Sequence, residues 1–243
     1  MANSYFKFKQ FTIQQDRCAM KVTTDGCLFG AWAGNEVISL RSEIKWVLDI
    51  GTGTGLLALI LAQKNEMRID AIEIDKDAFE QATENIAASP WADRIKIIRG
   101  DVKNFLFPHK YDVIISNPPF YENELKADDK KKNIAHHGDE LSLVELLAVI
   151  KNNLSSGGIF YLLLPYKRNE EIKKLLFEND LTVSSLVFVK QSHNHDYFRI
   201  MLAGKIKTAA ANETMIEEMA ITDEYGQYTA RFKTLLGDYY LNL

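Results

Sequence analysis

Short apolar or alternating runs and longer stretches with helical spacing follow one another along the chain from about residue 46 onward. The strand-like runs cover residues 45–50, 68–74, 95–99, 111–116 and 159–164, and the helix-like stretches cover 56–64, 76–88, 141–153 and 167–179. This alternation predicts an α/β fold with a doubly wound, mostly parallel sheet and helices on both of its faces. Two last strands, 181–189 and 198–203, have no helix between them, which predicts an antiparallel hairpin at one edge of a seven-stranded sheet.

The segments on either side of this alternating core, residues 45–203, have a different character. Residues 1–44 contain no long linker, so we expect this N-terminal extension to pack on the core. Residues 204–226 are acidic and predicted to be looser, whereas 228–241 returns to a helical pattern. We therefore expect a single domain over residues 1–243, in which the C-terminal segment 204–243 carries a docked helix.

Composition and charge narrow the class of protein. Hydrophobic residues make up 47% and charged residues 26% of the chain, as in ordinary globular proteins, and the net charge of −4 excludes an overall basic field. We find no apolar segment of a secretory signal and no run near the ~18 apolar residues of a membrane span. The two cysteines, Cys18 and Cys27, form no CxxC motif and are expected to be reduced and buried, which favours the cytoplasm.

A glycine-rich turn follows the first core strand. The sequence D-I-G-T-G-T-G places Gly51, Gly53 and Gly55 at alternate positions before a helix, with Asp49 just ahead of them. Glycine allows positive φ and close approach of a ligand, and the helix start offers free N–H groups. The spacing is not the dinucleotide pattern GxGxxG, and the absence of a following lysine argues against a Walker-type phosphate loop. A purely structural turn would also favour glycine.

Acidic residues after the second and third strands complete this pattern. Glu73 closes the second strand about 20 residues after the glycines, where an acid commonly holds a ribose diol. Asp75 is expected to cap the helix that starts at Lys76. A nucleoside ligand without a pyrophosphate fits these features, and S-adenosylmethionine is such a ligand. Asp101 could accept a hydrogen bond from the adenine amino group of the cofactor, or serve only as a turn or N-cap residue.

The fourth strand ends in S-N-P-P-F, residues 116–120. Ligands in such sheets bind outside the carboxyl ends of the strands, so this elbow should face the glycine loop. Proline fixes φ and restricts the residue before it, which aims the side-chain oxygen of Asn117 and the carbonyl of Pro118 at one point. Two acceptors suit an –NH₂ group, and Phe120 offers a face for stacking a planar ring. Taken alone, the motif could also be a rigid turn.

This arrangement suits methylation of an exocyclic amine. The lone pair of such an amine is delocalised into the ring, and accepting both N–H bonds frees it for attack on the methyl sulfonium of the cofactor. The step needs positioning and preorganised dipoles rather than a strong base. A glutamine amide poses the same problem, so the motif alone leaves RNA adenine, DNA adenine and protein glutamine open as substrates.

Three segments carry a resemblance to one family over nearly the whole chain. They are FKFKQFTIQQDRCAMKVTTDGCLFGAW (6–32), N-P-P-F-Y-x-N (117–123) and Y-T-x-x-F-x-x-L-x-x-x-Y-Y-L (228–241). The chain resembles the Rossmann-like class I S-adenosylmethionine-dependent methyltransferases with an NPPY-type motif, and more closely the bacterial tRNA1(Val) (adenine-N6)-methyltransferases. The N-terminal block is more specific than the other motifs. The resemblance implies N6-methylation of the adenosine just 3′ of the anticodon, at tRNA position 37.

The resemblance also implies roles for particular residues. The implied catalytic motif consists of Asn117, Pro118, Pro119 and Phe120. The implied cofactor-binding residues are Gly51, Gly53, Gly55 and Glu73, with Asp49 supporting the loop and Asp101 near the cofactor adenine. Thr24 and Asp25 are expected to border the methionine end of the cofactor, or alternatively to cap a helix that starts near Gly26.

The segment after the motif offers weaker candidates for RNA contact. Tyr121 could share the stacking role of Phe120, whose position more commonly holds tyrosine. A lysine triplet could meet tRNA phosphates: Lys130, Lys131 and Lys132. However, residues 122–139 carry four lysines against five acidic residues, so a solvated charged loop is the alternative. The histidine pairs, His136 with His137 and His193 with His195, are interpreted as loop residues, and no metal site is expected.

The expected partner is the anticodon stem-loop of a tRNA, bound by a cytoplasmic monomer without a membrane or an obligate protein partner. Unstacking the target base costs a few kcal/mol, and stacking of roughly 1–3 kcal/mol per base can offset it. Glutamine methyltransferases usually carry an extra helical domain and DNA enzymes a target-recognition insert, and neither is visible here. A non-catalytic RNA-binding module that holds the cofactor is the remaining alternative, which the intact motif disfavours.

Overall fold

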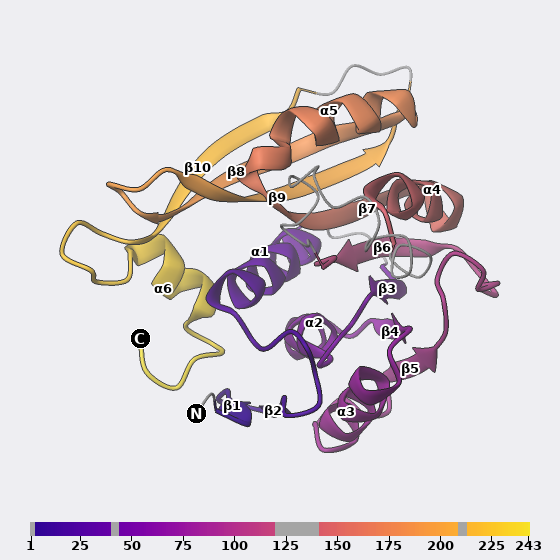
Figure 1. Ribbon diagram of the computed structural model, residues 1–243, viewed down its shortest axis with the longest axis horizontal. Coiled ribbons are helices and arrows are strands. Elements are labelled where there is room, and N and C mark those ends of the chain that lie inside the picture. Colours follow the sequence, from indigo (N-terminus) through magenta and orange to yellow (C-terminus); the bar gives the residue numbers. More distant parts are fainter. Residues whose placement is uncertain (1–2, 40–43, 120–140, 209–212) are drawn as a thin grey trace, which may run out of the picture.

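The computed structural model describes residues 3–39, 44–119, 141–208 and 213–243, and its centre is an eight-stranded sheet (Figure 1). The strand order is β10-β8-β9-β7-β6-β3-β4-β5. The strands are β3 (Trp46–Ile50), β4 (Arg68–Glu73), β5 (Ile95–Arg99), β6 (Tyr111–Ser116), β7 (Leu154–Pro165), β8 (Leu181–Ser192), β9 (Tyr197–Ile206) and β10 (Met215–Thr222). The expected doubly wound sheet is confirmed.

The order of the strands places the switch point of the sheet between β3 and β6, because the chain adds strands on one side of β3 and then on the other. From β3, the chain builds outward through β4 and β5 on one side and through β6 and β7 on the other, and these pairs are all parallel. Strand β9 alone is antiparallel to its neighbours β7 and β8, so the predicted hairpin is confirmed. Ligands of such sheets bind at the carboxyl ends of the strands beside the switch point.

The eighth strand, β10, was missed by the sequence prediction. It pairs in parallel with β8, with Met215 opposite Ser185 and Thr222 opposite Ser192. The expectation of a looser acidic segment is therefore wrong for these residues. Strand β10 is the edge of the sheet, and its first half is largely exposed and includes Glu217 and Glu218. Its apolar residues are interrupted by these two glutamates, so the segment shows neither the continuous apolar run nor the strict alternation on which the prediction relied.

Helices cover both faces of the sheet, as predicted (Figure 1). They are α1 (Thr24–Ser39), α2 (Leu56–Lys64), α3 (Lys76–Ala87), α4 (Leu143–Asn153), α5 (Asn169–Glu178) and α6 (Ala230–Leu236), with a 3₁₀ turn at Tyr166–Arg168. Successive strand residues point to opposite faces. Val47 therefore packs in the core that α1, α2 and α6 share, and Leu48 packs in the core beneath α4 and α5.

The N-terminal residues form a separate two-stranded hairpin, β1 (Tyr5–Lys7) with β2 (Thr12–Gln14). The buried side chain of Asn85 on α3 joins this hairpin to the glycine loop. Its Oδ1 accepts from the Gln14 amide at 2.8 Å, and its Nδ2 donates to the carbonyls of Gln14 and Thr54, both at 2.9 Å. Two segments far apart in sequence are thus fixed to each other through one amide.

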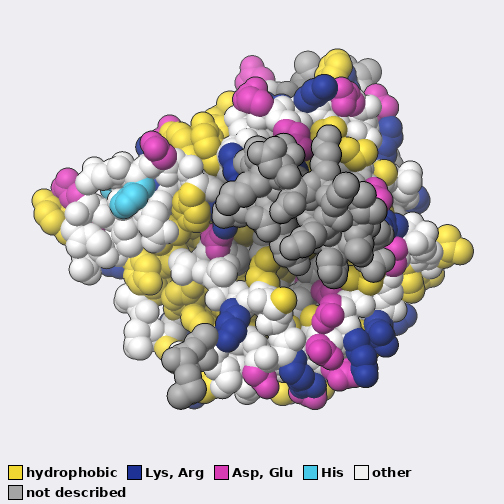
Figure 2. Space-filling model, in the orientation of Figure 1, with side chains coloured by type: hydrophobic (Ala, Val, Ile, Leu, Met, Phe, Trp, Pro, Cys, Tyr) yellow, Lys and Arg dark blue, Asp and Glu magenta, His cyan; other side chains and the backbone are white. Residues whose placement is uncertain are grey.

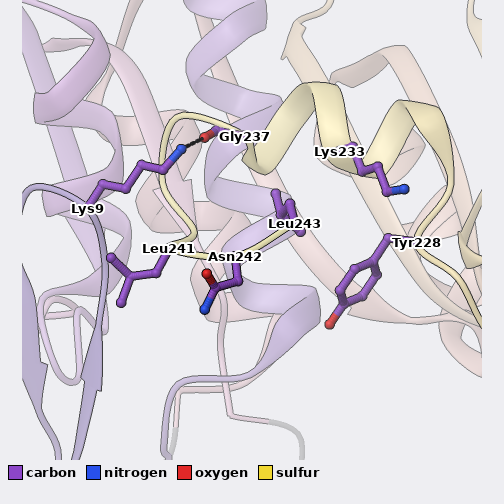
Figure 3. A pocket seen from close by; sticks show the side chains of 7 residues that line it. All are labelled: Lys9, Tyr228, Lys233, Gly237, Leu241, Asn242 and Leu243. Atoms are coloured by element: carbon purple, nitrogen blue, oxygen red, sulfur yellow. Dashed lines mark hydrogen bonds between the residues drawn. The ribbon is translucent and has the colours of Figure 1, made fainter.

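The N- and C-terminal segments also meet. The Lys9 amide donates to the Tyr239 carbonyl at 2.8 Å, and the Lys9 ammonium donates to the Gly237 carbonyl at 2.5 Å (Figure 3). A surface cavity of about 670 Å³ lies here, between the Lys9 side chain, α6 and the last residues. It contains none of the site residues expected from the sequence.

Candidate active site

A second cavity, of about 310 Å³, lies at the carboxyl ends of β3, β4 and β6, beside the switch point. It brings together the glycine loop, the end of β4, the turn after β5 and the segment after β6. The sequence-predicted residues that line it are Gly51, Gly53, Glu73, Asp101, Asn117, Pro118 and Pro119. The structure therefore gathers the two motifs at one place, although Gly51 and Asn117 are 66 residues apart in sequence (117 − 51).

The glycine loop adopts a backbone that side chains rarely allow. The φ angles are 68° at Gly51, 56° at Gly53 and 84° at Gly55. No heavy atom lies within 4 Å of the position that a Cβ on Gly51 or Gly53 would take, whereas a Cβ on Gly55 would meet Ile86 at 3.4 Å. The first two glycines thus leave an open cradle, and the third allows α2 to pack closely against α3.

Glu73 is fixed by three backbone amides. Its Oε2 accepts from Gly53 N at 2.9 Å, and its Oε1 accepts from Ile74 N at 2.9 Å and from Asp75 N at 3.0 Å. The residue is 8% exposed, at the wall of the cavity. The carboxylate therefore cannot swing away, and it holds the glycine loop to the end of β4. Asp75 caps α3 by accepting from Ala78 N at 2.8 Å, as predicted.

Asp49 lies fully buried beneath the loop and does not line the cavity. Its Oδ2 accepts from the Thr52 hydroxyl at 2.6 Å, and its Oδ1 has no hydrogen-bond partner within the described part of the chain. Burial, opposed in part by the Thr52 hydrogen bond, raises the pKa of Asp49 to about 7. The side chain supports the loop through Thr52, and its second oxygen accepts no hydrogen bond from a described residue.

Asp101 closes the turn after β5. Its Oδ1 accepts from Lys103 N at 2.9 Å, and its Oδ2 accepts from the Asn104 side-chain amide at 2.9 Å. This is the turn role that the sequence left open as an alternative. The residue also lines the cavity, so the turn fixes an acidic group at the cavity wall.

The segment after β6 forms the opposite wall. The Ser116 hydroxyl donates to the Ile50 carbonyl at 2.8 Å, which anchors the end of β6 to β3. Asn117 is half-buried, Pro118 is buried and Pro119 is exposed. Among the described residues, the only hydrogen-bond partner of the Asn117 side chain is the Met20 sulfur, at 3.8 Å from Nδ2. The amide is thus placed at the cavity by the backbone and bonded weakly by the protein itself.

Several predicted residues lie outside the described part of the chain, and their roles stay predictions. They are Phe120, Tyr121, Lys130, Lys131, Lys132, His136 and His137.

An N-terminal segment, residues 18–23, contributes a wall that the sequence did not reveal. Cys18, Met20 and Thr23 are among its cavity-lining residues. The segment is held by Gln81 of α3, whose side-chain oxygen accepts from Arg17 N at 3.1 Å. Gln81 and Asn85 are four residues apart and both buried. Buried polar side chains at helical spacing signal an attached segment, because such groups need partners.

Thr24 and Asp25 are not among the residues that line the cavity, and their place beside the methionine end of the cofactor stays a prediction. Thr23 lines the cavity, and the Thr23 hydroxyl accepts from Gly26 N at 3.3 Å at the start of α1. Asp25 Oδ1 also accepts from Gly26 N, at 3.1 Å, while its Oδ2 accepts from Arg199 Nε at 2.7 Å. Helix α1 begins at Thr24, earlier than the expected start near Gly26.

The described residues form neither a metal site nor a disulfide. In the described ranges, no three His, Cys, Asp or Glu side chains gather in a way that could hold a metal ion. Cys18 and Cys27 are free and buried, and burial raises the pKa of the Cys18 thiol to about 11. No helix in these ranges has both the length and the apolar character that crossing a membrane requires.

Known proteins are similar to this chain in sequence and in fold. The family described as "Methyltransferase small domain" matches residues 37–176. A protein of Phocaeicola vulgatus named tRNA1(Val) (adenine(37)-N6)-methyltransferase is 40% identical over the full length of both chains. The chain belongs to the family of tRNA1(Val) (adenine(37)-N6)-methyltransferases, which share the methyltransferase small domain. A protein of the same name from Dyadobacter fermentans is 39% identical and covers 98% of each chain. The resemblance noted in the sequence is confirmed.

Solved structures agree on the fold. A predicted O-methyltransferase from Agrobacterium tumefaciens superposes with a TM-score of 0.63 at 15% identity, over 90% of this chain and 100% of that one. The glycopeptide N-methyltransferase MtfA, solved with S-adenosylmethionine, superposes with a TM-score of 0.54 at 12% identity, over 73% of this chain and 94% of that one. At such identities the likeness concerns the fold alone.

Proposed function

We propose that this protein transfers a methyl group from S-adenosylmethionine to the exocyclic N6 of adenosine 37 in tRNA1(Val). One observation carries the proposal: the open glycine loop with Glu73 and the Asn117–Pro119 segment form facing walls of one cavity. The first is a nucleoside-binding arrangement and the second presents acceptors for an –NH₂ group. The names of the full-length relatives supply the substrate and the atom.

The residues present fit the cofactor. Gly51 and Gly53 leave space in which a ligand can approach the backbone, and the buried Asp49 supports this loop from beneath through the Thr52 hydroxyl. Both oxygens of Glu73 are oriented by backbone amides, so the carboxylate is ready to accept from ribose hydroxyls. When bound, the cofactor supplies a methyl group on a positively charged sulfur.

The acceptor side orients the amine. The Asn117 side-chain oxygen and the Pro118 carbonyl accept the two N–H bonds of N6, which draws the lone pair out of the adenine ring. Proline rigidity and the Ser116 anchor keep these acceptors in place before the substrate arrives. The amine nitrogen would bond the methyl carbon as the carbon–sulfur bond breaks and leaves a neutral thioether, and one N–H proton would pass to solvent water. Phe120 is proposed to stack on the target adenine.

We further propose that the protein acts as a monomer in the bacterial cytoplasm, where its tRNA resides. The N-terminal wall of the cavity comes from the same chain, through residues 18–23, and the cavity needs no second copy to close that side.

The direct test is a methyl-transfer assay with labelled S-adenosylmethionine and total bacterial tRNA that lacks this modification, followed by nucleoside mass spectrometry. We expect N6-methyladenosine in one valine tRNA and in no other tRNA. Cofactor binding without transfer to any tRNA would refute the substrate. A DNA adenine and a protein glutamine amide would then be tested in the same assay.

A further inference from the structure

Strand β9, which lies two strands away from β6 in the sheet, contains a β-bulge. Val189 of β8 lies opposite Arg199, but the next residue, Lys190, lies opposite Tyr197, so Phe198 is an extra residue in β9. A bulge of this kind redirects side chains and is common beside active sites. Here Phe198 packs against the core on the α1 side, and Arg199 contacts α1 directly.

The guanidinium of Arg199 is held in a defined position. Its Nε donates to Asp25 Oδ2 at 2.7 Å, its Nη1 donates to the Phe198 carbonyl at 3.2 Å, and its Cζ lies 5.3 Å from the centre of the Phe198 ring. The Arg199 side chain remains 36% exposed, whereas that of Asp25 is 13% exposed. Two of the nitrogens of the guanidinium are therefore engaged by the protein, while the side chain as a whole stays partly exposed.

This group lies on the side of Asn117 that faces away from the glycine loop. Asp25 is next to Gly26, and a Cβ on Gly26 would lie 3.9 Å from Asn117 Nδ2. In the sheet, β6 is followed by β7 and then β9, where Arg199 lies opposite Pro165 at the end of β7. The glycine loop and Glu73 lie on the β3–β4 side of Asn117, so the β7–β9 side is the one left for the ribose and phosphates of an acceptor nucleotide.

The surface in this direction is suited to single-stranded RNA. Figure 2 shows hydrophobic side chains gathered between the grey atoms and the lobe at the left that carries a histidine side chain. The turn between β8 and β9 contains His193 and His195. Phe198 is half-buried beside Arg199, and an aromatic ring with an adjacent arginine matches the stacking and phosphate contacts that bind unpaired nucleotides.

We propose that Arg199 binds a phosphate that flanks the target adenosine, and that Asp25 is the positioning residue that aims it. The inference rests on the proposed function, because it takes the acceptor to be a nucleotide in RNA. A guanidinium suits this task because its fork of N–H groups matches phosphate oxygens, and phosphate contacts fix the register of a nucleic acid on a protein. The alternative is that the Arg199–Asp25 pair only ties β9 to α1.

The test uses the full-length protein and a stem-loop RNA with the unmodified valine anticodon loop. The variants are Arg199→Ala, Arg199→Lys and Asp25→Asn. A matched control is Arg231→Ala, which removes another interelement pair, that of Arg231 on α6 with Glu217 on β10. For each variant we would measure RNA affinity at several salt concentrations, kcat and KM, cofactor affinity and the melting temperature. A second RNA carries neutral methylphosphonate linkages on both sides of the target adenosine.

We expect Arg199→Ala to weaken RNA binding about tenfold, the loss of one charge-assisted hydrogen bond, and to reduce the slope of log affinity against log salt by about one. Cofactor affinity should not change. The neutral linkages should weaken binding to the wild type and to Arg231→Ala, but have little further effect on Arg199→Ala, because the two changes remove the same contact. Arg199→Lys should keep the salt slope and lose part of the affinity, since its charge remains but its fork is gone.

Asp25→Asn should keep the dependence of RNA affinity on salt. The neutral linkages should weaken RNA binding by this variant less than they weaken binding by the wild type, because Arg199 is then no longer held toward the flanking phosphates. A purely structural pair would instead lower the melting temperature of Arg199→Ala while RNA affinity, salt slope and methylphosphonate penalty stay as in the wild type, and that result would overturn the proposal. If the wild type neither binds nor methylates the RNA, the proposed function itself has failed. If the wild type methylates and Arg199→Ala is indistinguishable from it, only this inference has failed.

Discussion

The two walls of the candidate active site are built in different ways. On the cofactor side, three backbone amides hold Glu73, the Thr52 hydroxyl holds Asp49, and the loop is shaped by glycines with positive φ. On the acceptor side, the Asn117 side chain has one weak hydrogen bond to a described residue, the Met20 sulfur at 3.8 Å. Its position comes from the backbone of the proline segment.

The difference shows which side is completed by a ligand. Polar groups on the cofactor side are largely satisfied within the protein and present a finished shape. Among the described residues the acceptor-side amide bonds only weakly, so its hydrogen-bonding capacity is available to an –NH₂ group in the reacting state. The predictions below separate binding on one side from chemistry on the other.

The largest effect is expected at Asn117. Asn117→Ala removes an acceptor that polarises the amine, so kcat should fall by about 10²–10³ while the cofactor dissociation constant stays unchanged. Single-turnover transfer and calorimetric cofactor binding would measure the two. Asn179→Ala, which removes an amide bonded to the Leu175 carbonyl at the end of α5, is the control and should retain full activity. Full activity in Asn117→Ala would contradict the mechanism.

A second effect should concern the cofactor side alone. Glu73→Gln replaces one acceptor oxygen with an –NH₂ group that faces backbone N–H donors, so the loop and the ribose site lose a charge-assisted contact. We expect the cofactor dissociation constant to rise by about 10–100-fold, equivalent to roughly 1.5–3 kcal/mol. Glu66→Gln, at a side chain that is 95% exposed, should leave it unchanged. Equal changes in both variants would show that Glu73 is not at the binding site.

The glycine cradle allows a sharper comparison at smaller magnitude. Gly53 and Gly157 both have positive φ, 56° and 89°, and neither has an atom within 4 Å of the Cβ position. Alanine at either site should cost about 1–2 kcal/mol of the free energy of unfolding through backbone strain. Only Gly53→Ala should also weaken cofactor binding, because only its methyl group enters the cavity. Chemical denaturation and cofactor titration of both variants would show whether the effects separate.

The smallest effect, counted per pH unit, is a change in the free energy of unfolding that arises from the titration of Asp49. Its folded-state pKa, about 7, is above the reference value of 3.8, so the folded state binds more protons than the unfolded state between these values. The wild type should therefore lose free energy of unfolding as pH rises from about 4 to 7, by at most about 1.4 kcal/mol per pH unit, relative to Asp49→Asn. Urea unfolding of both proteins across this range checks it. Parallel pH curves would mean that Asp49 titrates normally.

The sequence could predict those parts of the site whose residues carry their own local signal. Alternating glycines after an apolar strand indicate a tight turn wherever they occur, and Glu73 follows at the end of the next strand. The capping role of Asp75 was equally readable, because it stands just before a helical pattern. The parallel topology then determines that these residues share one edge of the sheet with Asn117.

The remainder depends on tertiary contacts that no local pattern encodes. The segment 18–23 lines the cavity because Gln81, on a helix distant in sequence, accepts from Arg17 N just before it. Strand β10 forms because β8 offers a free edge, although Glu217 and Glu218 interrupt its apolar residues. The pairing of Asp25 with Arg199 depends on a one-residue bulge in β9, and a shift of one residue in a strand reverses the face to which a side chain points.

The central claim is that the two walls bring a methyl donor to an exocyclic amine of RNA. It is tested most directly with two otherwise identical anticodon stem-loops, one with adenosine at the target position and one with purine riboside, which lacks the amine. Methyl transfer from labelled S-adenosylmethionine would be followed by nucleoside mass spectrometry. The account predicts N6-methyladenosine in the first RNA and no label in the second, although both bind. Equal labelling of the two RNAs, or labelling of neither while the cofactor binds, would contradict it.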